Sequence, residues 1–145
     1  MRKIIILFAA LLVISCGSTK NRSTSQSTFS GKHELVDDQT FKIDDYSEDE
    51  SYGYTQKNPI KVGNLDEGPK NERRFLNALA GPNGEKISYY RIGSCCEFNT
   101  KNSPFGVGLL DKYSVTYEGA TKEIELYINM YDADVLKVPV GFTLK

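Results

Sequence analysis

The sequence predicts an α+β domain in which one helix packs on a curved antiparallel sheet of about four to five strands. Apolar residues recur at helical spacing in one segment, 71–80, and alternate with polar residues in several segments after it. Nine tyrosines and seven phenylalanines in 145 residues supply the large side chains expected of a β-rich core. The folded domain is expected to span residues 52–145.

The single helix is expected to follow a short strand over 59–62, which ends at the turn signal Gly63 and Asn64. Asn71 is the predicted N-cap of the helix, and Gly81 marks its end. The apolar stripe at helical spacing consists of Phe75, Leu76 and Leu79. The polar residues expected to face water are Arg73, Arg74 and Asn77.

Alternating patterns predict the strands of the sheet. Residues 86–92 form the first, and 109–118 with 122–131 form a hairpin around a short glycine-containing connection. A last strand is expected over 136–144, where Pro139 favours a position at the edge of the sheet because proline cannot donate to a neighbour.

The first sixteen residues have the organisation of an export signal. Arg2 and Lys3 precede an unbroken apolar run from Ile4 to Ile14, which is shorter than the roughly 18 residues a membrane-spanning helix needs. Ser15 and Cys16 close the run in the manner of a bacterial lipobox. The sequence therefore predicts a signal peptide over 1–15 and a mature chain lipidated on Cys16.

A flexible acidic tether is expected over 16–51. Residues 17–30 are almost free of apolar side chains, and 34–50 are rich in Asp and Glu. Such segments bury too little apolar surface to offset the entropy of ordering the chain. A short strand at 40–43 is the one regular element considered there.

Composition excludes several function classes. The formal net charge of −1 offers no basic surface for nucleic acid. With Cys16 lipidated, two thiols remain, and the only histidine, His33, lies in the expected tether, so no metal site and no catalytic set of residues is predicted. No cofactor is expected. The remaining candidates for acid–base chemistry are carboxylates on adjoining strands that are expected to face solvent: Asp111, Glu123 and Glu125.

Cys95 and Cys96 are the sharpest local feature, and they are expected on a loop between two strands. Adjacent Cα atoms lie about 3.8 Å apart, closer than the roughly 4.4 to 6.8 Å of ordinary disulfides. A bond between them would close a strained eight-membered ring, which is typical of labile or switching disulfides. The alternatives are a buried pair that organises the loop, an intermolecular disulfide or a metal ligand.

Tyrosines are the other candidate contact residues. A surface for peptide or glycan is considered at Tyr89, Tyr90, Tyr127 and Tyr131. The structural alternative is that most of these rings are neighbours across strands.

The chain resembles a family of short, uncharacterised bacterial envelope lipoproteins in four segments: 68–72, 76–87, 93–96 and 109–113. The Gly-Ser-Cys-Cys element at 93–96 is the most specific of them, although the family usually has proline where this chain has Glu97. Family members often carry the inherited name 2-dehydro-3-deoxyphosphooctonate aldolase. An enzyme of that class resembles a TIM barrel of about 250 residues and uses cytoplasmic substrates, so we reject an aldolase activity on length and compartment.

These observations predict a lipid-anchored protein of the bacterial cell envelope, expected at the outer membrane and facing the periplasm. Its partners would be the membrane, through the lipid on Cys16, and an envelope protein or glycan, through a non-enzymatic binding or assembly domain. One alternative is a thiol-dependent enzyme or redox switch that uses Cys95 and Cys96. A second is a protease inhibitor, because the order of elements is similar to that of cystatin-like folds, although one fold hosts many functions.

Overall fold

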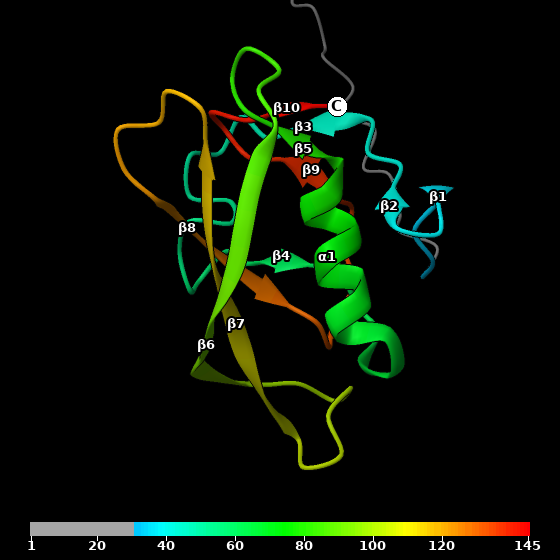
Figure 1. Cartoon of the computed structure of the whole chain (residues 1–145). Helices are drawn as coiled ribbons and strands as arrows, with labels where there is room; N and C mark the ends of the chain where they lie inside the picture. Colours follow the sequence, from blue (N-terminus) through cyan, green and yellow to red (C-terminus); the bar gives the residue numbers. More distant parts are fainter. Residues whose placement is uncertain (1–30) are drawn as a thin grey trace, which may run out of the picture.

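The computed structural model describes residues 31–145, which form a mixed α+β domain with one α-helix and several small sheets (Figure 1). The α+β class predicted from the sequence is confirmed. The signal peptide over 1–15, the lipid acceptor Cys16 and the polar stretch 17–30 lie outside the described residues.

The main sheet has four strands in the order β4, β8, β7, β6. Their bounds are Ile60–Lys61 for β4, Ile124–Asn129 for β8, Val107–Tyr117 for β7 and Ile87–Asn99 for β6. The predicted hairpin is confirmed, since β7 and β8 are antiparallel with Tyr113 opposite Leu126. β4 lies parallel to β8, with Ile60 opposite Ile128, so the sheet is mixed and not wholly antiparallel. The helix and two long strands separate β4 from β8 along the chain, which allows the crossover that a parallel pair requires.

β6 continues through the residues that were expected to form a loop. Gly93 to Phe98 lie within the strand, and the connection to β7 is the shorter segment 100–106. Two irregularities in the β6–β7 register allow this, one between Arg91 and Gly93 and one between Cys95 and Glu97. Cys96 has a φ of 61°, which is typical of a residue in a bulge. The prediction of a loop was wrong because an alternating pattern does not survive two bulges.

The helix begins earlier than predicted. A 3₁₀ turn, η1 (Leu65–Glu67), leads directly into α1 (Gly68–Ala78), with Glu67 at the N-cap position and Pro69 in the first turn. Proline favours a first helical turn because its φ is already helical and its missing N–H is not needed there. Asn71 is therefore inside the helix and not its cap, and its buried side chain donates to the backbone carbonyl of Gly63.

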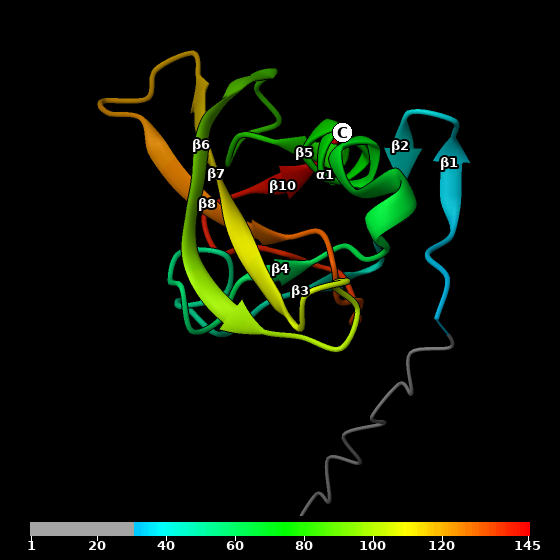
Figure 2. The same ribbon diagram turned by 90° about the horizontal axis from the view of Figure 1, so that it is seen from below.

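The predicted apolar stripe of the helix is confirmed, and it packs on the main sheet. Phe75 and Leu76 have no exposed surface and share a core with Val115, Leu126 and other apolar residues of the sheet. β5 (Leu79–Ala80) continues the chain directly after α1. Figure 2 shows α1 end-on, with the main sheet on one side and the N-terminal strands on the other.

The N-terminal acidic stretch is part of the fold and not a tether up to residue 51. β1 (Leu35–Asp37) and β2 (Thr40–Phe41) form an antiparallel pair beside α1. Phe41 and Ile43 are only 3% and 5% exposed and belong to the core. Two apolar residues at alternating positions therefore anchor an otherwise acidic segment in the core, and the folded domain begins well before residue 52.

The C-terminal segment is divided between two small sheets. β9 (Lys137–Val138) lies parallel to β3 (Asp45–Tyr46), and β10 (Thr143–Leu144) is antiparallel to β5. Between β9 and β10 the chain turns at Pro139, whose carbonyl accepts from the N–H of Phe142, and at Gly141, with a φ of 91°. The prediction of one continuous strand over 136–144 was wrong because this turn interrupts the alternation. The strands of the described chain thus form four small sheets instead of one curved sheet.

Candidate functional site

An open pocket of about 850 Å³ lies at the N-terminal end of α1. Four separate segments of the chain line it. His33 and Phe41 come from the N-terminal segment, Asn64 and Glu67 from the approach to the helix, Asn102 from the β6–β7 connection and Tyr131 from the residues after β8. Because these segments are distant in sequence, the pocket is a product of the tertiary fold.

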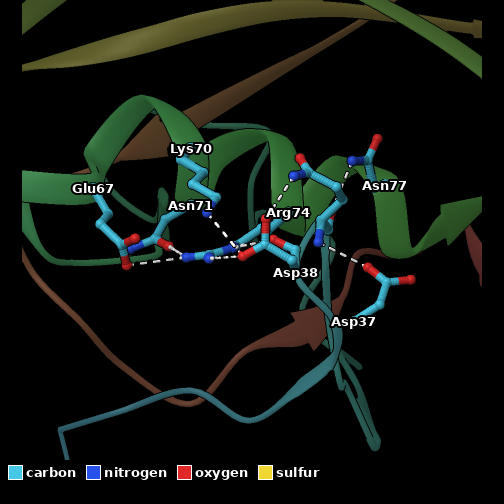
Figure 3. Close-up of polar contacts among 8 residues, drawn as sticks. Asp37, Asp38, Glu67, Lys70, Asn71, Arg74 and Asn77 are labelled. Carbon is cyan, nitrogen blue, oxygen red and sulfur yellow. Dashed lines mark hydrogen bonds and ion pairs between the residues drawn. The ribbon is translucent and has the colours of Figure 1, made fainter.

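Arg74 is one of the residues that line the pocket, and its side chain links the segment after β1 to the approach to the helix (Figure 3). The guanidinium is almost fully buried and donates to the Asp38 carbonyl at 2.9 Å, to Glu67 Oε2 at 3.1 Å and to Asn71 Oδ1 at 2.9 Å. Arg74 Cζ lies 6.0 Å from the centre of the Phe41 ring. The prediction that Arg74 faces water was wrong, since β1 and β2 cover this side of the helix.

The hairpin formed by β1 and β2 is attached to α1 by further polar contacts in the same close-up (Figure 3). Lys70 Nζ lies 2.9 Å from Asp38 Oδ1, and Asn77 Nδ2 donates to the Gln39 carbonyl at 2.8 Å. The hydrogen bond from Lys70 is the main reason that the pKa of Asp38 falls below its usual range. These contacts position one wall of the pocket.

The opposite wall is held by Asp132. Its carboxylate accepts from the Thr100 hydroxyl at 2.6 Å, from Asn102 Nδ2 at 2.8 Å and from Asn129 Nδ2 at 3.0 Å. The β6–β7 connection is thereby tied to the end of β8, and Asn102 and Tyr131, from these two segments, both line the pocket.

Several polar groups around the pocket have unused hydrogen-bonding capacity. Among residues 31–145, the side chain of Asp66 makes no hydrogen bond, and neither do Asn64 Nδ2 or the Tyr131 hydroxyl. His33 is half-buried, packs against the Phe41 ring at 5.0 Å and hydrogen bonds to the backbone of Val62. Burial lowers the pKa of His33, so its ring is neutral at pH 7.

A second polar cluster lies between α1 and the main sheet. The Tyr113 hydroxyl donates to Glu72 Oε2 at 2.8 Å, and Glu72 has no exposed surface. Arg91 holds Asp111 with two hydrogen bonds of 2.8 Å, and the Ser94 hydroxyl donates to the same carboxylate at 2.7 Å. The bulge between Arg91 and Gly93 brings both Arg91 and Ser94 to the side of β6 that faces Asp111.

Glu72 retains its proton at neutral pH in this environment. Burial raises its pKa to about 8, and the neighbouring Asp111 carboxylate adds to the rise, while the hydrogen bond from Tyr113 opposes it. Within residues 31–145, Glu72 Oε1 is buried and accepts no hydrogen bond. A protonated Glu72 resolves this, because its carboxyl proton can be donated toward Asp111. Because Glu72 is fully buried, we infer that this cluster is structural and holds α1 against β6 and β7.

Glu72 was not predicted as a site residue and Asp111 was expected to face solvent, although both stand at core positions of their elements. Glu72 precedes Phe75 and Leu76 by three and four residues, and Asp111 alternates with Tyr113 and Val115. Asp111 is only 4% exposed, whereas Glu123 and Glu125 are exposed as expected. Each of these two residues is charged and stands where the periodic pattern expects an apolar side chain. That exception was the signal in the sequence for a buried polar residue.

Cys95 and Cys96 form a disulfide in the structure, with Cα atoms 3.8 Å apart. Both residues are partly buried, and they lie in β6, the strand at one edge of the main sheet. Ser94, which immediately precedes Cys95, belongs to the Asp111 cluster. The disulfide therefore adjoins a group of residues that links β6 to the helix.

The four tyrosines considered as one surface have different surroundings. The Tyr89 hydroxyl donates to Asn77 on α1, while that of Tyr90 donates to Glu123. Lys112 lies over the Tyr127 ring at 5.7 Å, and Tyr131 packs edge-on against Phe98 at 5.9 Å. Of the four, Tyr131 lines the pocket.

Within residues 31–145, no three or more His, Cys, Asp or Glu side chains are grouped to hold a metal ion. No helix in this part of the chain has the length and apolar character needed to cross a membrane. Comparison with protein-family models, with curated proteins and with solved structures finds no match, so the site is interpreted from its own geometry.

Proposed function

We propose that the chain is a lipid-anchored protein of the bacterial cell envelope, located at the outer membrane and facing the periplasm, whose α+β domain binds another envelope component without catalysis. The basic and apolar residues before Cys16 support the anchor and the compartment. Anchoring raises the effective concentration of a neighbour in the same envelope, so modest affinity is sufficient for binding.

The pocket at the N-terminal end of α1 is the observation that carries the binding role. Its volume of about 850 Å³ lies within the roughly 300 to 1,000 Å³ of typical ligand sites. Polar groups with unused hydrogen-bonding capacity line it, and hydrogen bonds of buried Arg74 and partly buried Asp132 hold lining residues Glu67 and Asn102. Such pre-organisation reduces the entropy lost on binding.

Photo-crosslinking from the pocket tests this proposal in intact cells. A photoreactive residue replaces exposed Asn102 at the pocket, and a matched one replaces Glu118, an exposed residue just after β7. The full chain should give a reproducible crosslinked product from position 102 and none of the same product from position 118. Equal products from both positions, or none from position 102 at normal abundance, would contradict the proposal.

A redox switch at Cys95 and Cys96 is a second candidate, supported by the disulfide on the edge strand β6. An external dithiol would supply two electrons and two protons, which convert the disulfide to two thiols while the dithiol becomes a disulfide. Differential alkylation of cells followed by mass spectrometry tests this. The switch requires that both forms occur and that their ratio follows the redox conditions; a pair found in one form throughout would exclude it.

An inhibitory role is the third candidate, based on the order of elements shared with cystatin-like folds. The single helix, followed by the consecutive antiparallel strands β6, β7 and β8, supports it. Direct inhibition assays on cysteine proteases with the full chain test this role, and lack of inhibition at micromolar concentrations would exclude it.

A further inference from the structure

We infer that the pocket at the N-terminal end of α1 binds an uncharged sugar unit of an envelope glycan. This inference rests on the proposed binding function and names the chemical class of its ligand. The charge balance of the pocket, its unused hydrogen-bonding groups and the Tyr131 ring support this ligand class.

The charges that line the pocket balance one another. Lys32 and Arg74 are positive, and Asp66 and Glu67 are negative. Arg74 is already neutralised by Glu67 at 3.1 Å and by Asp38 at 3.3 Å, and His33 is neutral at pH 7. A charged ligand would therefore meet no excess of opposite charge to offset its loss of hydration.

Donors and acceptors are both available in the pocket. Within the described part of the chain, Asp66 and Asn102 Oδ1 have free acceptor capacity, while Asn64 Nδ2 and the Tyr131 hydroxyl are free to donate. Sugar hydroxyls act as donor and acceptor at once, so a polyhydroxyl ligand matches such a mixed lining. A ligand that mainly accepts hydrogen bonds, such as phosphate, or one that mainly donates them, such as an amine, would leave part of the lining without a partner.

Tyr131 presents an aromatic ring at the pocket. Phe41 also borders the pocket, but it is only 3% exposed and belongs to the core. Tyr131 is half-buried and braced edge-on by Phe98, so little side-chain entropy is lost when a ligand packs on it. The C–H face of a sugar ring suits such a surface. A peptide is the competing ligand, but peptide recognition generally uses a strand edge or apolar side-chain pockets, whereas most residues that line this pocket are polar.

Isothermal titration calorimetry of the full chain tests the inference, in a detergent that lacks a sugar headgroup. The neutral probes are chitotriose and maltotriose, which distinguish an N-acetylated glycan from a plain glucan. The charged probes are inorganic phosphate and tetralysine, and a neutral tetrapeptide represents the peptide alternative. We expect at least one neutral trisaccharide to bind and the other probes to bind at least tenfold more weakly.

Two pocket variants and a control locate the binding. Asp66→Ala removes an exposed acceptor, and Tyr131→Phe removes only a hydroxyl, so neither should lower the thermal midpoint of unfolding by more than the exposed control Glu118→Ala. Each pocket variant should weaken trisaccharide binding at least fivefold, and the control should leave it unchanged. Equal binding by all variants, preference for a charged probe or the tetrapeptide, or no trisaccharide binding would overturn the inference.

The outcome separates this inference from the proposed function. If crosslinks from position 102 recover an envelope protein while no trisaccharide binds, the sugar assignment fails and the binding role remains. If position 102 gives no specific crosslink and no trisaccharide binds, both fail.

Discussion

At the scale of single residues, buried polar groups distinguish this domain from an ordinary small α+β core. Glu72, Asp111 and Arg74 are each no more than 5% exposed, and each has partners on a different element. Buried polar groups cost free energy unless they are hydrogen bonded. Their positions could be read from the sequence, as charged residues within apolar patterns, but their partners could not, because these are up to 41 residues away.

Glu72→Gln should change how stability depends on pH. The folded pKa of Glu72 is about 8, above its ordinary value of 4.5, so its contribution is fully present below pH 4.5 and is lost as pH rises through 8. Glutamine stays neutral and can still accept from Tyr113 and donate toward Asp111. The variant should therefore gain stability relative to the wild type by up to about 1.4 kcal/mol per pH unit across this window.

Urea unfolding at several pH values between 4.5 and 8.5 measures this difference. The depressed pKa of His33 gives an opposite trend in part of the window, but it is common to both proteins and cancels in the comparison. If the difference in unfolding free energy between Glu72→Gln and the wild type does not vary with pH, Glu72 is ionised in the folded protein and the prediction is wrong.

Arg91→Ala should destabilise the fold more than Arg91→Ala combined with Asp111→Asn. The single change leaves the Asp111 carboxylate, 4% exposed, without its paired cation. Because Arg91 is itself about half exposed, we expect a loss of about 2 kcal/mol, less than for a fully buried pair. The double variant removes the uncompensated charge and should recover part of that loss in urea unfolding, whereas additive losses would show that the pair does not interact.

At the scale of elements, the local sequence pattern was sufficient to predict the centre of the helix and the hairpin of β7 and β8. It failed where backbone irregularity or a remote contact decides the structure. Gly93 and Cys96 adjoin two bulges that keep β6 in register past the expected loop, and Phe41 buries a segment whose composition is that of a linker. Neither effect is visible in a window of ten residues.

The attachment of β1 and β2 to α1 should depend on Arg74 far more than on Asp38. Asp38 is exposed, and its ion pairs at the surface are worth about 0 to 1 kcal/mol. Arg74→Ala removes a buried side chain with hydrogen bonds to three residues and should cost about 2 to 4 kcal/mol. Amide hydrogen exchange over residues 35–41 should accelerate strongly in Arg74→Ala and little in Asp38→Ala; similar rates in both would contradict the role given to Arg74.

At the scale of the whole molecule, the pocket is the feature that no local pattern could predict. It requires the N-terminal segment on one side of α1 and Asn102 and Tyr131 on the other, so it exists only after the tertiary fold has formed. The residues up to Cys16 predict export and lipidation, and under the proposed function the pocket is the surface with which the exported domain binds a neighbour.

Hydrogen–deuterium exchange of the full chain in envelope fragments, compared with the purified chain in detergent, tests this claim most directly. We predict slower exchange in the fragments at residues 63–67, 102–103 and 131–133, around the pocket, and unchanged exchange at the exposed turn 118–123. Equal exchange at the pocket in both preparations, or protection confined to the turn, would contradict it.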